Sequence, residues 1–269
     1  MTMAARHAGP GERAGHYRFR HVARMEWIKL RSLRSTWWTL GITVCGATAM
    51  AVVIGSNTRN AGGDLTNNAL AGVVPGLLLT GVLGVLMMTS EYTSGMIRAT
   101  LAAVPGRGLV LAAKAAVFGI VALAAGEAAG FISFAAGGAA LRHGIAAPAL
   151  TQPGVLRAVL LAGASFSLIG LVGLGLGAIV RHTAAAIAVL VGGVYLAAQL
   201  VGVAAEGVAG YMPVLIIGNS LSTTKPVTCA PHASLCPHFL SAWAGLGMLC
   251  LYAAVVLVIG GWLLARRDA

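Results

Sequence analysis

Charged side chains are scarce in this sequence, and their scarcity excludes most soluble folds. Asp, Glu, Lys and Arg together make up 9% of its 269 residues, whereas a soluble domain carries about a quarter. Hydrophobic residues make up 58% of the chain, and the mean hydropathy is +0.87. This composition predicts a polytopic membrane protein.

Acidic residues are especially few, and the motifs of common enzymes are missing. The chain has 7 Asp and Glu against 18 Lys and Arg, but the basic residues surround apolar runs and do not alternate with aromatic residues, so we expect a lipid bilayer and no nucleic acid as partner. None of the three lysines follows a glycine, as the ATP-binding loop G-x-x-x-x-G-K-[ST] requires. Neither H-E-x-x-H nor G-x-S-x-G occurs. We expect no catalytic residue, no cofactor and no metal.

Long apolar runs define the predicted architecture. A helix needs about 20 apolar residues to cross a bilayer. The expected spans are residues 37–55, 70–89, 109–140, 150–180, 183–204 and 241–264. The predicted fold is all-α, with six transmembrane helices in one domain (residues 20–269) that follows a disordered tail (residues 1–19). Six spans place both termini on the same side of the membrane.

Residues 20–36 have the pattern of an amphipathic helix that lies along a membrane surface. Apolar residues fall on one side and arginines on the other, but Glu26 and Lys29 lie on the apolar side. Their spacing of three residues lets them form an ion pair. The helix serves either as a basic membrane anchor or as a docking element. Its candidate interfacial residues are Trp27, Lys29, Arg31 and Arg34.

A polar interval, residues 90–108, separates the second and third spans. It is too short for a domain but long enough for one short helix, expected over residues 94–104, with Thr93 or Ser94 as N-cap and Pro105 in its stop. Met96, Leu101 and Val104 share an apolar stripe on this helix. We expect this face to dock on a partner.

The distribution of Lys and Arg predicts the orientation. If the termini are inside, 14 of the 18 Lys and Arg lie on the inner side. Because cytoplasmic loops are enriched in these residues, both termini and residues 90–108 are predicted to be cytoplasmic, and the protein to lie in the cytoplasmic membrane.

Two stretches together resemble the permeases of the ABC-2 transporter superfamily. They are EWIKLRSLRSTWWTL (residues 26–40) and TSEYTSGMIRATLAAVPGRG (residues 89–108), the second followed by Lys114. The resemblance implies an export permease that pairs with a second permease subunit, as a homodimer or heterodimer, and is driven by a separate ATP-binding cassette ATPase. It also implies that the interval between the second and third spans is the ATPase-coupling element. The coupling residues it suggests are Glu91, Gly95, Leu101, Pro105 and Arg107, and the predicted helix adds Met96 on its stripe and Arg98 off it.

Polar residues within spans are further candidates, because they usually face a bundle interior or mark a pathway. Glu127 and Gln199 are such residues, and we place Glu127 near the outer boundary of the third span. The glycines of the fourth and fifth spans, including Gly192 and Gly193, are expected to let helices approach closely.

Residues 205–240 are predicted to be external and to include a short re-entrant or interfacial helix. Cys229 and Cys236 lie in this region, with His232 between them and His238 after them. On an oxidising face, a disulfide is favoured over a zinc site or two unpaired thiols.

The function predicted from these patterns is transport of a hydrophobic or amphipathic substrate, such as a lipid, peptide or drug, by a permease subunit without its own ATP site. The alternative is an integral membrane enzyme or an immunity-type membrane protein that is not coupled to ATP. The scarcity of charge within the spans favours an apolar cargo over an ion.

The predicted orientation can be tested by cysteine labelling. A membrane-impermeant maleimide applied to intact cells should label a cysteine introduced at Asn67 and should leave one at Thr93 unlabelled until the membrane is opened. Labelling of Thr93→Cys in intact cells would reverse the orientation.

Overall fold

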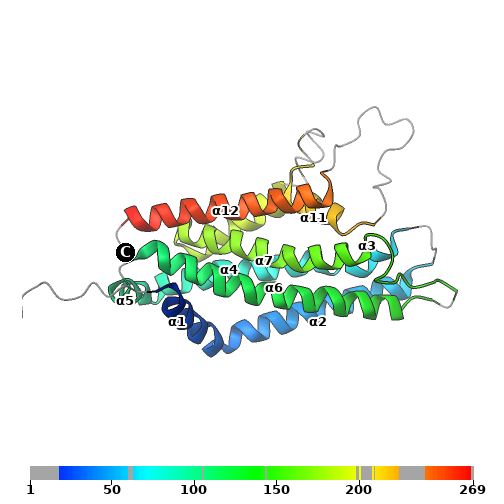
Figure 1. Cartoon of the computed structure of the whole chain (residues 1–269), viewed down its shortest axis with the longest axis horizontal. Helices are drawn as coiled ribbons and strands as arrows, with labels where there is room; N and C mark the ends of the chain where they lie inside the picture. Colours follow the sequence, from blue (N-terminus) through cyan, green and yellow to red (C-terminus); the bar gives the residue numbers. More distant parts are fainter. Residues whose placement is uncertain are drawn as a thin grey trace, which may run out of the picture.

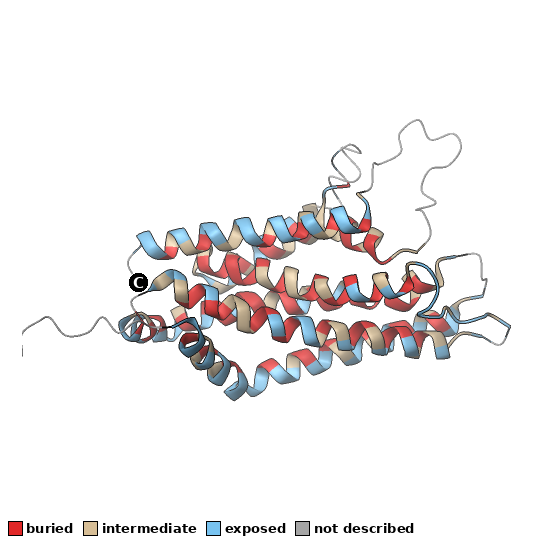
Figure 2. Cartoon of the chain, viewed as in Figure 1, coloured by how far each residue is buried: buried red, intermediate tan, exposed pale blue. Residues whose placement is uncertain are grey.

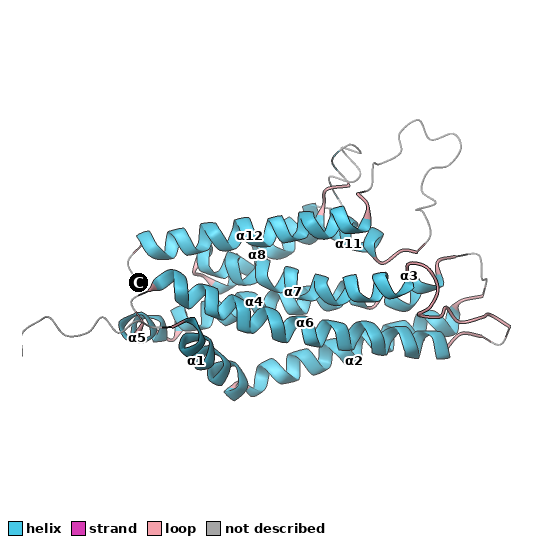
Figure 3. Cartoon of the chain, in the orientation of Figure 1, coloured by secondary structure: helices cyan, strands magenta, loops and turns pink. Residues whose placement is uncertain are grey.

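The computed structural model describes residues 18–59, 63–104, 106–142, 144–197, 200, 208, 210–223 and 240–267. Within these ranges the chain is built of helices and contains no strand (Figure 3). The long helices lie side by side in one bundle (Figure 1). The expected tail lies outside the described residues up to residue 17, as do Pro105, Gln199, Cys229 and Cys236.

Five of the described helices are long and apolar enough to cross a membrane. They are α2 (Arg34–Asn57), α4 (Val73–Thr93, preceded by the short α3, Leu65–Leu70), α6 (Arg107–Ala139), α7 (Val155–Val180) and α12 (Ala242–Arg266). Each coincides with a span predicted from the apolar runs. The prediction of an all-helical chain with several helices long and apolar enough to cross a membrane is therefore confirmed for the described residues.

The fifth expected span is only partly described. Helix α8 (Thr183–Leu190) continues into a π-helical segment, η1 (Val191–Leu196). Together α8 and η1 (Thr183–Leu196) are about 21 Å long, which is less than the roughly 30 Å of a hydrocarbon core. A sixth crossing therefore stays a prediction. The short helix expected after it is present as α11 (Pro213–Ser220).

The two ends of the bundle carry different groups of charged residues. One end, which we call the α5 end, holds α1 (Phe19–Ser32), α5 (Met96–Ala103) and the described C-terminal residues (Figure 1). At the opposite end, the α3 end, Arg142 donates to the carbonyl of Ser56 and Arg157 to that of Ser222. The helices thus separate the basic residues into the two groups on which the predicted orientation rests.

Three predicted boundaries are wrong. The amphipathic helix ends at Ser32 because Leu33 is extended (φ −82°, ψ 95°), so Arg34 belongs to α2. This break lets α1 turn away from the axis of α2 (Figure 1). Glu91 lies in the last turn of α4 and not in a loop, and the N-cap of α5 is Gly95, whose φ of 69° favours glycine.

Helix α7 forms the centre of the bundle and packs against α4, α6 and α12. Glycines make these contacts close: a Cβ added to Gly84 on α4 would collide with the carbonyl oxygen of Gly170 on α7, and one on Gly173 with that of Gly81. The predicted packing role of the α7 glycines is therefore confirmed. For Gly192 and Gly193 it stays a prediction, because an added Cβ at either position meets no atom of the described residues within 4 Å.

The outer surface of the bundle is apolar. Trp38 of α2, Ile120 of α6 and Val258 of α12 are 72%, 69% and 70% exposed. In Figure 2, α2 and α12 show long exposed faces, while the buried residues concentrate on the helices between them. Cys45 and Cys250 also lie on these outer faces and are not packed inside. A surface of this kind needs lipid or another apolar partner.

The close contact between α4 and α7 can be tested with an alanine substitution. Gly84→Ala should lower the thermal midpoint of the detergent-solubilised protein, because overpacking costs about 1–3 kcal/mol. Gly46→Ala is the matched control, because a Cβ added to Gly46 on the surface of α2 meets no atom of the described residues within 4 Å. The thermal midpoint is measured as the temperature at which half of the monodisperse size-exclusion peak is lost after heating. Equal midpoints for the two variants would contradict this packing.

Candidate functional site

Four charged side chains from three helices meet at the α5 end of the bundle. They are Glu26 and Lys29 of α1, Glu91 of α4 and Lys114 of α6, and we call them the charge cluster. Two ammonium groups face two carboxylates, so the cluster has no net charge when all four are ionised.

The two lysines bridge the two carboxylates. The Lys29 Nζ lies 3.0 Å from an oxygen of Glu26 and 3.0 Å from Glu91 Oε1. The Lys114 Nζ lies 2.9 Å from the same Glu91 oxygen and 2.5 Å from the second oxygen of Glu26. The predicted pair of Glu26 with Lys29 is therefore present, as part of a larger network.

The cluster also holds α5. The hydroxyl of Thr100 on this helix accepts a hydrogen bond of 3.1 Å from Lys29 Nζ. Ile97 and Thr100 are both buried, so one face of α5 packs onto the bundle. A single lysine on α1 thus contacts groups on α1, α4 and α5.

Burial makes these contacts strong and costly to break. The side chains of Glu26, Glu91 and Lys114 are 1%, 3% and 2% exposed, whereas Lys29 is 23% exposed. Burial by itself lowers the pKa of the Lys29 ammonium, but Glu26 and Glu91 outweigh this effect, and its pKa lies above the usual value. The stabilisation from Lys29 is therefore present below its unfolded pKa of about 10.4 and is lost as the pH rises through the folded pKa.

Two further contacts tie helix ends together near the cluster. Arg107, at the start of α6, donates to the carbonyl of Leu264 at 3.1 Å and to that of Arg267 at 2.8 Å. The Arg181 guanidinium lies 5.2 Å from the centre of the Tyr92 ring, which joins the end of α7 to the last turn of α4. The ends of four long helices are thus cross-linked at the α5 end.

The predicted coupling residues do not all face outward. Met96 is 46% exposed and Arg98 is exposed, but Leu101 is half-buried against apolar residues of this same chain. Val104, expected on the docking stripe with Leu101, is 4% exposed. The stripe prediction is therefore wrong for these two residues, because the apolar face of α5 covers the bundle. The outward face consists of Met96, Arg98, Ala99, Ala102 and Ala103.

The remaining predicted residues of the N-terminal helix lie outside the charge cluster. Trp27, Arg31 and Arg34 are exposed, and only Lys29 enters the cluster. Glu26 and Lys114 complete it with Glu91, and these two residues were not among the predicted site residues. Two signals pointed to them: a charged pair on the apolar side of α1, and a lysine inside an apolar run, where an ionised group needs a partner.

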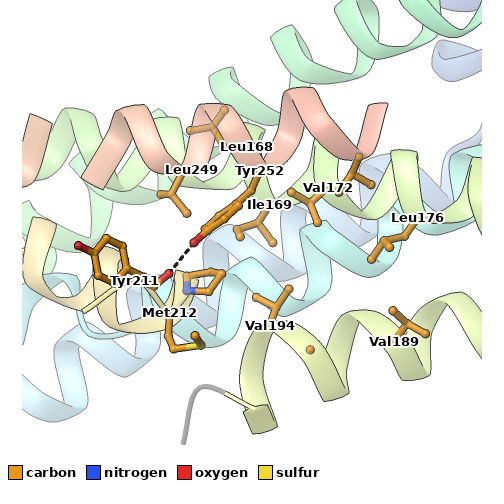
Figure 4. Close-up of a pocket in the computed structure, with 13 residues that line it drawn as sticks. Leu168, Ile169, Val172, Leu176, Val189, Val194, Tyr211, Met212, Leu249 and Tyr252 are labelled. Carbon is orange, nitrogen blue, oxygen red and sulfur yellow. Dashed lines mark hydrogen bonds between the residues drawn. The ribbon is translucent and has the colours of Figure 1, made fainter. Parts of the chain in front are cut away.

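A separate apolar cavity of about 320 Å³ lies between α7, α8 with η1, and α12 (Figure 4). Ile169, Val172, Val194 and Leu249 are among its lining residues. The Tyr252 hydroxyl donates a 2.8 Å hydrogen bond to the carbonyl of Tyr211 at its border, which satisfies the polar group there (Figure 4). The cavity can hold an apolar group but offers no catalytic chemistry.

No protein-family model and no curated protein matches this chain.

The charge cluster can be tested by removing one partner and then two. Lys114→Met should destabilise the protein by about 3–5 kcal/mol, because it leaves buried carboxylates without their counter-ion. The double variant Glu91→Gln/Lys114→Met should lose less than the sum of the two single losses, with a coupling of about 0.5–3 kcal/mol. Denaturant titration in detergent measures all four species, and Arg98→Ala is the exposed control. Additive losses would mean that the two side chains do not interact.

Proposed function

We propose that this chain is the permease subunit of an ABC-2-type exporter that moves a hydrophobic or amphipathic substrate across the cytoplasmic membrane. A separate ATP-binding cassette ATPase supplies the energy, and a second permease subunit completes the assembly. The observation that carries this proposal is the charge cluster, because it fastens a short surface helix to the ends of two long apolar helices.

The cluster supports a mechanical role for α5. A partner that pushes on α5 also acts on α1 and α4, since Thr100 of α5 accepts a hydrogen bond from Lys29 of α1, which in turn binds Glu91 of α4. Displacement of α5 is then transferred to the ends of α4 and α6. Rigid transfer from a surface element into packed helices is a recurring way to drive a conformational change.

The outward face of α5 supports contact with another protein. It is small and mostly apolar, with Met96 beside three alanines and one arginine at its edge. Alanines allow close approach of another surface, and methionine adapts to the shape of its partner. Orientation of the α5 end toward the cytoplasm, predicted from the Lys and Arg count, places this face where an ATPase can reach it.

Two features support an apolar substrate. The spans contain few charged groups, and the cavity between α7, η1 and α12 is lined almost entirely by carbon. An apolar lining with few polar groups favours hydrophobic ligands over ions.

The proposal can be tested by copurification of an ATP-binding cassette ATPase with the tagged chain, followed by ATP turnover. Met96→Asp should release the ATPase and abolish substrate-stimulated turnover, because it adds a charge to a contact that excludes water. Leu150→Asp, at an exposed apolar position of the α3 end, is the matched control and should keep the complex.

Leu101→Asp separates docking from folding. Because Leu101 packs on the bundle, this variant should reduce membrane expression or thermal stability before it affects docking. An ATPase that stays bound and fully coupled in Met96→Asp would remove α5 from the mechanism. The absence of any cassette ATPase from the purified wild-type chain would contradict the proposed function itself.

A further inference from the structure

Glu127 lies within α6, far from the charge cluster. It follows Lys114 on the same helix by about 20 Å along the axis. Apart from Ser133, only apolar residues and glycines occupy the rest of α6 beyond it, from residue 128 to Ala139. This carboxyl group therefore lies within the apolar part of α6, in the half of the bundle toward the α3 end, and not near the end of the helix as the sequence predicted.

The carboxyl group is held against α7 at Gly163. A Cβ added to Gly163 would overlap Cδ and Oε1 of Glu127, so the glycine provides the space that the carboxyl group occupies. The two helices are in close contact at this level, because an added Cβ on Gly126 would stand 2.7 Å from the Gly163 carbonyl oxygen. The position of Glu127 is thus built into the contact between α6 and α7.

No basic side chain of α6 or α7 pairs with this carboxyl group among the described residues. Lys114 binds Glu26 and Glu91, Arg157 donates to Ser222, and Arg107 donates to the end of α12. Arg181 stacks on Tyr92 at the other end of α7. The buried Oε2 of Glu127 has no hydrogen-bond partner in the described part of the chain.

Neither protonation state gives Glu127 Oε2 a partner among the described residues. An ionised carboxylate at membrane depth needs a counter-ion. A protonated carboxyl group needs an acceptor for its O–H, and the described residues place none at Oε2. A ligand with positive charge would meet the requirement of the ionised form directly.

The surroundings restrict the kind of cation. A metal ion needs several oxygen, nitrogen or sulfur ligands, and the described residues contain no group of three acidic, His or Cys side chains. The Glu127 side chain is partly exposed although its Oε2 atom is buried, and the neighbouring Leu123 and Leu160, one turn along α6 and α7, are 38% and 44% exposed. An apolar flank beside one carboxylate suits a cation with an apolar body.

We propose that Glu127 is the binding site for a monovalent lipophilic cation that approaches the contact between α6 and α7 from the bilayer. The carboxylate pairs with the positive charge, and the apolar body of the ligand lies on the flank that Leu123 and Leu160 border. Binding at this site does not require an ATPase. The statement that such a cation is a transported substrate rests on the proposed function.

The full-length chain in phosphatidylcholine nanodiscs and the probe tetraphenylphosphonium test this proposal. The wild type should bind the radiolabelled cation saturably, and tetraphenylborate, an anion of the same shape, should not displace it. Glu127→Gln, which keeps the side-chain shape and removes the charge, should weaken binding about tenfold or more. Ser167→Ala, which removes a hydroxyl that donates to Gly119 on the same helix pair, should leave binding unchanged.

Three results would overturn the site: no saturable binding by the wild type, equal displacement by the borate anion, or unchanged affinity in Glu127→Gln. The first two need no variant, so they decide the question even if Glu127→Gln fails to fold. Cation binding without ATPase capture would leave this site intact while contradicting the proposed function, and ATPase capture without cation binding would do the reverse.

Discussion

The buried contact among Glu26, Lys29, Glu91 and Lys114 is the interaction on which the α5 end of this molecule depends. Each group alone would be unfavourable in its position, since moving an unpaired charge out of water costs several kcal/mol. Together they neutralise one another, and Glu26 uses both of its carboxylate oxygens. The cluster therefore connects α1, α4, α5 and α6 at this end of the bundle.

The rest of the bundle is held by a different kind of contact. Between α4 and α7 the backbones approach at glycines, so the association relies on close packing of small residues rather than on ion pairs. This contrast divides the molecule into a glycine-packed apolar bundle and an end that is cross-linked by charges and by arginine contacts to helix carbonyls. A force applied at the charged end reaches the bundle through a few defined side chains, which is the physical basis of the proposed coupling.

The orientation of α5 changes the interpretation of its residues. An amphipathic pattern shows that a helix has two faces but not which molecule covers the apolar one. Here the chain itself covers that face, because Ile97, Thr100 and Val104 are buried against the bundle. The face left for a partner consists of small residues and Met96 with Arg98. Glu127 illustrates the same point within the membrane, where the position of its carboxyl group follows from a glycine on the neighbouring helix.

The sequence by itself determined the helical membrane class and the approximate position of each described span, because these depend on the length and composition of local apolar runs. It also determined that Glu26 and Lys29 pair, since a spacing of three residues places them together on any helix. Only the tertiary structure decided that Glu91, Thr100 and Lys114 join them, because these contacts link positions 62, 71 and 88 residues apart. Local periodicity carries no information on which helix ends meet, and that meeting is set by how all the apolar faces pack at once.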